Sequence, residues 1–220
     1  MSQGKCDIFA HLWEPTDKGY DFSTWSGLSN VESSNNDIEV FKEKWNPKAI
    51  LTEKNMQFAS ESLYDKFQSI LPGEDEKLYN FNICLSQLYS LEKAIELYEN
   101  YVKESNEKYD YVVFLRTDLC IWEFPDLRYL EKDIFYFSSF FSFDHFADLC
   151  FITDPKYVDG LKAYSFITNE EISFENELRF GNAESIKKAS FLRKHSVNNL
   201  RQIPLPVRVV RGATCVGLKW

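Results

Sequence analysis

The sequence has 220 residues, and its 25 lysines and arginines against 34 aspartates and glutamates give a formal net charge of −9. This balance offers no broad basic face, which argues against nonspecific nucleic-acid binding and against attachment to anionic lipids. The hydrophobic share of 44% and charged share of 27% are those of a globular protein, so we expect a single domain over residues 1–220. The aromatic share of 16% is high, but aromatic bulk usually fills a core and names no function.

The cysteines indicate a reducing compartment. They are dispersed, odd in number and never arranged as C-x-x-C, which is typical of free thiols: Cys6, Cys84, Cys120, Cys150 and Cys215. The short polar start lacks the features of a secretory leader, and no apolar run approaches the roughly 18 residues of a membrane span. We therefore expect a cytoplasmic protein without a membrane span.

The first half of the chain alternates predicted strands and helices. Short apolar runs bounded by turn residues predict strands over residues 6–13, 49–53 and 111–115. Apolar positions recurring every three to five residues predict amphipathic helices over 37–45 and 80–107. The last of the three strands is apolar throughout, the pattern of a strand covered on both faces. This alternation predicts an α/β fold with a mostly parallel sheet flanked by helices.

The second half continues with shorter elements. Two apolar runs predict strands over residues 134–137 and 149–152, and a late strand is expected over 207–211. Asp154-Pro155 is a typical helix start, predicting a helix to about Phe166, and another helix is expected over 183–194. The aromatic segment between the first two strands, Phe140 to Phe146, is read as core or as a lid over the site.

Polar side chains at predicted strand ends are the candidates for chemistry, because ligands of open α/β sheets bind beyond the carboxyl ends of the strands. These are His11 with Trp13, Arg116 with Asp118, and Asp148. A carboxylate such as Asp118, directly after an apolar strand, needs a cation or hydrogen-bond donor. A divalent cation, Mg²⁺ or Mn²⁺, meets that need, and an Arg116–Asp118 ion pair is the alternative. Trp13 fits base or sugar stacking and core packing equally well.

Four motifs follow one another along the chain: Asp7-Ile-Phe-Ala-His-Leu-Trp13, Tyr89-Ser-Leu-Glu-Lys-Ala94, Tyr109 to Leu119, and Ala147-Asp-Leu-Cys-Phe151. In this order they resemble the motifs of the small GT-A-like glycosyltransferases of bacterial surface-polysaccharide loci and large-genome viruses, which are related to the WavE-type lipopolysaccharide-synthesis proteins. Family members begin with an earlier strand, whereas this chain begins almost directly on the first motif. The resemblance therefore implies an N-terminally reduced GT-A-like domain.

The resemblance also implies a reaction and a set of roles. A sugar would move from a nucleotide-diphosphate donor to a hydroxyl group of a glycan or other acceptor. His11, Trp13, Arg116 and Asp118 would bind the nucleotide sugar, with Asp118 also holding Mn²⁺ or Mg²⁺. Asp148 is the first candidate for the base that takes the acceptor proton, followed by Glu177 and Glu175. The chain carries Arg116-Thr-Asp118 where an Asp-x-Asp motif would offer two carboxylates.

Two other interpretations stay open at this point. A degenerate relative would bind nucleotide or glycan without turnover, which the single metal carboxylate favours. An acidic interaction module would have no small-molecule site at all, which the net charge favours. The three histidines, His11, His145 and His195, are too scattered for a zinc site, so a structural role is the alternative for each.

Overall fold

The computed structural model describes residues 6–14, 35–54, 56–58, 60–67, 77–116, 119–121, 123–139, 146, 150–169, 182–205 and 207–209. Over these residues the chain is mixed α/β and divides into two compact units. The first unit contains strand β1 (Phe9–Trp13), helix α2 (Asn35–Trp45), strand β2 (Ala49–Glu53) and the part of helix α4 (Lys77–Ser105) from Lys93 onward. The expectation of a single domain stays a prediction.

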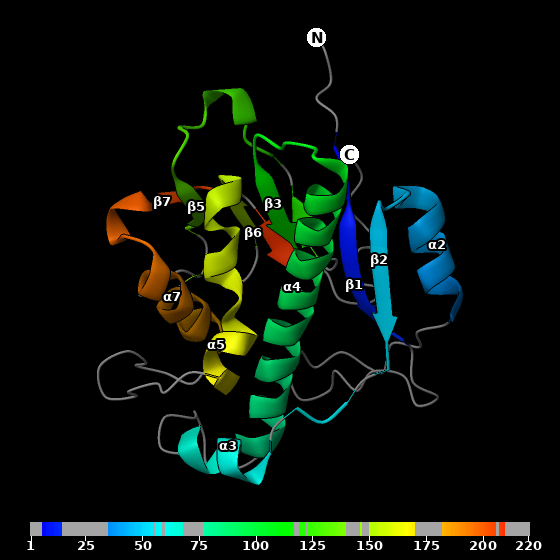
Figure 1. Ribbon diagram of the computed structural model, residues 1–220, viewed down its shortest axis with the longest axis vertical. Helices are drawn as coiled ribbons and strands as arrows, with labels where there is room; N and C mark the ends of the chain where they lie inside the picture. The colour runs from blue at the N-terminus through cyan, green and yellow to red at the C-terminus, as the bar shows by residue number, and fades with distance from the viewer. Residues whose placement is uncertain are drawn as a thin grey trace. The chain divides into compact units, whose positions relative to one another are not determined.

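The first unit is built on a parallel strand pair. β1 and β2 run side by side in parallel, with α2 in the connection between them (Figure 1). The ladder is closed at one end by the Lys48 N–H, which donates to the Ile8 carbonyl at 2.7 Å, and at the other by the Glu14 N–H, which donates to the Glu53 carbonyl at 2.8 Å. The chain's short apolar runs at 6–13 and 49–53 therefore form strands as predicted.

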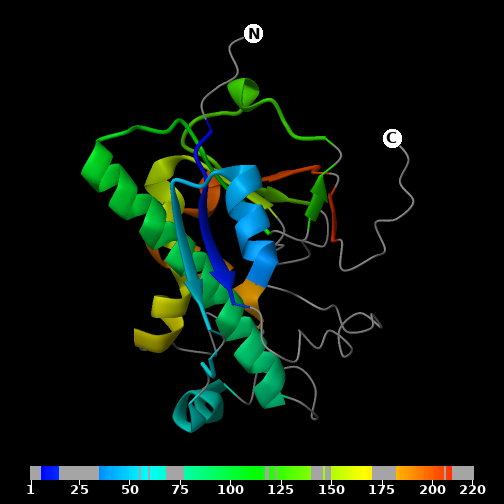
Figure 2. The ribbon, with the colours of Figure 1, turned by 90° about the vertical axis from the view of Figure 1, so that its right-hand side faces the viewer.

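Helix α4 covers one face of this pair. The Phe9 ring of β1 lies 5.7 Å from the ring of Tyr98 and 5.4 Å from that of Tyr101, both on α4. Because side chains alternate along a strand, Phe9, His11 and Trp13 all share this face. Figure 2 shows α2 in front of the two strands, with α4 behind them.

The second unit holds the remaining described elements. Its helices are α3 (Glu61–Phe67), α4 up to Glu92, α5 (Ala163–Asn169) and α7 (Ala183–Lys194), with 3₁₀ turns η1 (Leu127–Tyr129), η2 (Pro155–Leu161) and η3 (Val197–Asn199). Its strands are β3 (Val112–Leu115), β4 (Leu119–Ile121), β5 (Phe135–Ser138), β6 (Cys150–Thr153), β7 (Leu200–Ile203) and β8 (Val207–Val209). Four of them form a sheet in the order β3-β6-β5-β7, and β4 pairs with β8.

The two central strands of this sheet, β5 and β6, are buried at every position. One face packs Tyr136 and Ile152 into an apolar cluster with Leu205. The other face is aromatic: the fully buried Phe146 lies 5.2 Å from the ring of Phe135, which lies 4.7 Å from Phe191 of α7. Much of the aromatic excess is therefore core, and Phe146 itself belongs to it.

Glu92 on α4 is buried, although it belongs to the polar positions of the predicted amphipathic helix, which are expected to face solvent. Its carboxylate accepts hydrogen bonds from the Ser165 N–H at 2.8 Å and from the Ser165 hydroxyl group. Ser165 lies in the first turn of α5, where main-chain N–H groups have no partner within the helix. A buried carboxylate is stable only when such donors surround it, so this contact joins α5 to α4. Apolar side chains of both helices form the adjacent core, including Leu85, Leu88, Phe166 and Ile167.

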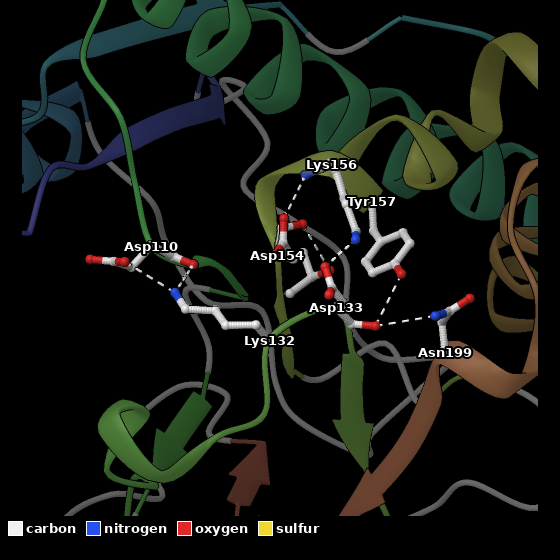
Figure 3. A network of polar contacts seen from close by, with 8 residues as sticks. Asp110, Lys132, Asp133, Asp154, Lys156, Tyr157 and Asn199 are labelled. Atoms are coloured by element: carbon white, nitrogen blue, oxygen red, sulfur yellow. Dashed lines mark hydrogen bonds and ion pairs between the residues drawn. The ribbon is translucent and has the colours of Figure 1, made fainter.

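A polar network fixes the turn that leads into β5 (Figure 3). Asp133 has a positive φ of 62°, and its carbonyl accepts hydrogen bonds from the Tyr157 hydroxyl at 3.0 Å and the Asn199 side chain at 3.2 Å. Its carboxylate pairs with the Lys156 ammonium group. The Asp154 side chain caps η2 by accepting from the Lys156 N–H at 3.1 Å. The start of β5 is thereby tied to η2 and to the segment before β7.

The described strands correct the predicted direction of the sheet and the predicted two-sided burial of β3. Of the five strand pairings, β1–β2 and β5–β7 are parallel and the other three are antiparallel, so a mostly parallel sheet is wrong for this part of the chain. An apolar run reports how far a strand is covered and carries no information on direction. β3 is moreover an edge strand that leaves Leu115 exposed.

The helix expected over residues 154–166 is a further correction, because the chain forms η2 and then α5. Asp154 does cap the start as predicted. Gly160 within η2 sits so close to α7 that an added Cβ would meet ring carbons of Phe191 and His195 at 2.8 Å. Close packing of η2 against α7 therefore requires glycine at this position.

Within the described segments, no helix is long and apolar enough to cross a membrane.

The buried contact of Glu92 predicts a stability effect. Glu92→Ala leaves the Ser165 N–H without its acceptor, and we expect the free energy of unfolding in urea to fall by about 1–3 kcal/mol. Glu96→Ala is the matched control, because Glu96 lies on the same helix, its side chain is 41% exposed, and it pairs with Lys93. That control should change the free energy by less than about 0.5 kcal/mol. Equal effects of the two variants would contradict the structural role of Glu92.

Gly160→Ala should also destabilise the protein. The new methyl group would overlap the fully buried Phe191 ring, and overpacking of this kind costs about 1–3 kcal/mol. The measurement is again the urea midpoint, read together with the unfolding slope to establish that the native state is unchanged in compactness. An unchanged midpoint would show that η2 and α7 are not packed as closely as described.

Candidate functional site

The carboxyl edge of the β1–β2 pair brings three functional side chains together. His11 and Trp13 come from β1, and Glu53 is the last residue of β2, paired with Trp13 in the ladder. The His11 Nε2 atom lies 3.0 Å from the Glu53 Oε2 atom. The imidazole and indole rings stand at 88° with their centroids 4.6 Å apart. Two predicted site residues thus lie at one strand end, together with a carboxylate that the sequence analysis did not select.

The histidine in this group is neutral at pH 7. Burial lowers the pKa of His11 most strongly, and the nearby Lys93 lowers it further, whereas the hydrogen bond and negative charge of Glu53 act to raise it; the net pKa shift is downward. A carboxylate can only accept, so the neutral ring places its proton on Nε2 and donates it to Glu53. The contact is therefore a hydrogen bond from a neutral donor to a carboxylate.

A second place of interest is where β3 ends and β6 begins. Leu115 pairs with Cys150 in the antiparallel ladder, and Arg116 follows β3 as a half-buried residue. Burial raises the pKa of the Cys150 thiol to about 12, which excludes a reactive thiolate there. On the neighbouring helix α7, the buried Lys187 holds its ammonium group 5.5 Å from the Phe151 ring.

The remaining predicted site residues lie outside the described residues: Asp118, Asp148, Glu175 and Glu177. Their assigned roles, including the metal ligand Asp118, stay predictions, as do the binding roles of His11, Trp13 and Arg116. Among the residues that the structure describes, no three His, Cys, Asp or Glu side chains lie close enough to hold a metal ion. His195 is packed against Tyr157 and bonded to Asp159 at 2.9 Å, a structural setting.

Two residues near His11 were missed by sequence reasoning. Glu53 was recognised only as the end of a short strand, although the carboxyl ends of parallel neighbours meet at one edge and so bring it to Trp13. Lys93 is one of the polar positions of the helix predicted over 80–107. Its ammonium group pairs with Glu96 at 2.6 Å, and its charge also acts on His11. Glu53 could have been found by treating both strand ends as one edge.

Comparison of the chain with protein-family models finds no match, and comparisons with curated proteins and with solved structures find none either. A functional argument therefore depends on the residues and their geometry.

The lowered pKa of His11 predicts how stability changes with pH. Above the ordinary histidine pKa of about 6.5, the ring is neutral in both the folded and unfolded chain. As the pH falls below that value, the unfolded chain binds the proton first, so the free energy of unfolding should decrease. His11→Gln should remove this part of the decrease between about pH 7.5 and 5.5, measured by urea unfolding. If His11 instead contributes more to the free energy of unfolding of the wild-type protein as the pH falls, the result would indicate a protonated His11 paired with Glu53.

Proposed function

We propose that this chain is a glycosyltransferase that moves a sugar from a nucleotide-diphosphate donor to an acceptor hydroxyl group. The observation that carries the proposal is the meeting of His11, Trp13 and Glu53 at the carboxyl edge of a parallel pair. This is the edge at which α/β proteins bind ligands. His11 and Trp13 also belong to the first motif of the family resemblance. A GT-A-like architecture is part of the proposal.

The pairing of β3 with β6 gives further support. Leu115 and Cys150 are partners in the ladder, so two strand ends lie next to each other. The segment carrying Asp118 continues from one of these ends, and the segment carrying Asp148 leads into the other. The described strand ends that these two segments adjoin in the sequence are therefore neighbours, which supports a shared site for the two motifs.

In the proposed reaction, the acceptor oxygen bonds to the anomeric carbon as the bond from that carbon to the diphosphate oxygen breaks. Asp148 accepts the proton of the acceptor hydroxyl group, with Glu177 and Glu175 as the other candidate bases. Arg116 binds a phosphate oxygen through its guanidinium group. A divalent cation, Mn²⁺ or Mg²⁺, held through Asp118 would supply stabilisation for the charge of the departing nucleotide diphosphate.

The test combines binding and turnover. Purified protein is incubated with UDP- and GDP-sugars in the presence of Mn²⁺ or EDTA, and the melting temperature and released nucleotide diphosphate are measured. We expect Asp118→Asn to lose the Mn²⁺-dependent stabilisation by donor, and Asp148→Asn to slow nucleotide release at least about a hundredfold. Asp65→Asn is the matched control, since Asp65 is an exposed carboxylate on α3.

Two results would contradict the proposal. One is the absence of stabilisation by any nucleotide sugar, with or without metal. The other is binding without nucleotide release, which would favour a degenerate relative that holds a nucleotide or glycan without turnover. The replacement of Asp-x-Asp by Arg116-Thr-Asp118 is the observation behind that second candidate.

A further inference from the structure

The connection between β4 and β5 carries the most exposed large aromatic side chain among the described residues. Tyr129, the last residue of the 3₁₀ turn η1, is 83% exposed. The turn projects beyond the strands of its own unit and is the short green coil at the top of both views (Figure 1 and Figure 2). An aromatic ring gains nothing from the core at such a position, and its faces are open to another molecule.

Arg128, the neighbour of Tyr129, is fixed by a bidentate ion pair. Its Nε atom lies 2.8 and 3.0 Å from the two carboxylate oxygens of Asp126, and its Nη2 atom donates to Oδ2. The Arg128 main-chain N–H donates to the same carboxylate at 3.0 Å, which caps η1. These contacts fill the carboxylate, which accepts about four hydrogen bonds. The N–H groups of Arg128 Nη1 make no hydrogen bond with any described residue, so the fixed guanidinium group still presents donors to solvent.

The main chain that presents these side chains is held on its far side as well. The Tyr111 hydroxyl group donates to the Leu130 carbonyl at 2.7 Å, and the Glu131 N–H donates to the Tyr136 hydroxyl group at 2.8 Å. Leu127 and Leu130 pack against the apolar cluster that contains Tyr136. A ligand therefore meets a turn that is already ordered, which lowers the entropy lost on binding.

The charge of this surface is balanced. The side-chain hydrogen bonds from Arg128 lower the pKa of Asp126 to about 2, so the two opposite charges are present together at neutral pH. The guanidinium carbon of Arg128 lies 5.9 Å from the centre of the Tyr129 ring, which places hydrogen-bond donors beside an aromatic surface. A neutral sugar ring has an apolar C–H face and hydroxyl oxygens that accept hydrogen bonds. The ring and the donors of this turn match those two parts.

We propose that Tyr129 and Arg128 form a saccharide-binding site, in which a sugar ring stacks on Tyr129 and its hydroxyl oxygens accept hydrogen bonds from Arg128 Nη1. The assignment of this sugar to a glycan acceptor rests on the proposed function, in which the acceptor supplies the receiving hydroxyl group. The site then binds a sugar unit of the acceptor other than the unit that reacts.

The experiment uses the full chain and stated probes: cellohexaose, maltohexaose and chitohexaose, with glucose and N-acetylglucosamine as single-ring probes. Binding is measured by saturation-transfer NMR and calorimetry. We expect Tyr129→Ala to weaken the saccharide that binds by at least about fivefold, because the stacking surface is lost. Tyr129→Phe keeps the ring and should stay within about twofold of the wild type. Arg128→Lys keeps the charge but loses the planar fork, and it should weaken binding by about threefold or more.

Trp45→Ala is the control, because Trp45 on α2 is also an exposed aromatic residue, with 58% exposure and a ring contact to Phe41. It should change the affinity by less than about twofold. Since the Tyr129 side chain lies mostly in solvent, Tyr129→Ala should leave the melting temperature unchanged, and its loss of affinity then reports the site. Unchanged affinity in Tyr129→Ala, or an equal loss in Tyr129→Phe or Trp45→Ala, overturns the inference.

Failure of the inference is distinct from failure of the proposed function. Absence of saccharide binding, with nucleotide release from UDP- or GDP-sugars intact, overturns the inference alone. Saccharide binding that depends on Tyr129, without binding of any nucleotide sugar, supports the inference and contradicts the proposed function. Where both hold, Tyr129→Ala should raise the KM for the oligosaccharide acceptor by about fivefold and leave kcat within about twofold, because the ring contributes binding and no chemistry.

Discussion

Both compact units bury side chains of a single helix, α4, and this double use constrains its sequence. Leu85 and Leu88 enter the core of one unit, and Tyr98 packs on Phe9 in the other. The helix passes from one unit to the other between two neighbouring charged residues, Glu92 and Lys93. Glu92 turns its carboxylate into the protein toward Ser165, whereas the charge of Lys93 acts on His11. Two consecutive polar residues of the helix therefore have separate roles: Glu92 accepts a hydrogen bond from the first turn of α5, and Lys93 helps to lower the pKa of His11 on β1.

Periodicity predicted most of the described helices and strands, because burying one face of a helix or strand requires apolar residues at the spacing typical of that element. It could not predict the direction of β6, since β3 and β6 are apolar whichever way they run. Nor could it predict that Glu92 is buried, because the sequence pattern is the same whether the carboxylate accepts hydrogen bonds from water or from Ser165. Such partners come from distant segments and carry no local signal.

The candidate site shows the same division. His11 and Trp13 could be predicted because a short strand ending in polar and aromatic residues marks a ligand-facing edge in α/β proteins. Glu53 lies 42 residues from His11, and only the parallel register brings them together. The difference in burial, with the imidazole fully buried and the carboxylate partly exposed, is a property of packing that composition and spacing do not encode.

The last hydrogen bond of the β1–β2 ladder, from Glu14 to Glu53, has a consequence for dynamics. Strand ends open locally at much lower free energy than a whole domain, so this bond is among the first in the pair to break. Each opening releases the main chain of the residue that carries the site's carboxylate. Ligand binding at the edge and protection of the Glu14 amide from solvent exchange are then linked. A ligand that binds only the closed form lowers the population of the open form, and it slows exchange of this amide in the same proportion. The fraction of molecules in which this edge is ordered is therefore set by the opening of one hydrogen bond, the one from Glu14 to Glu53.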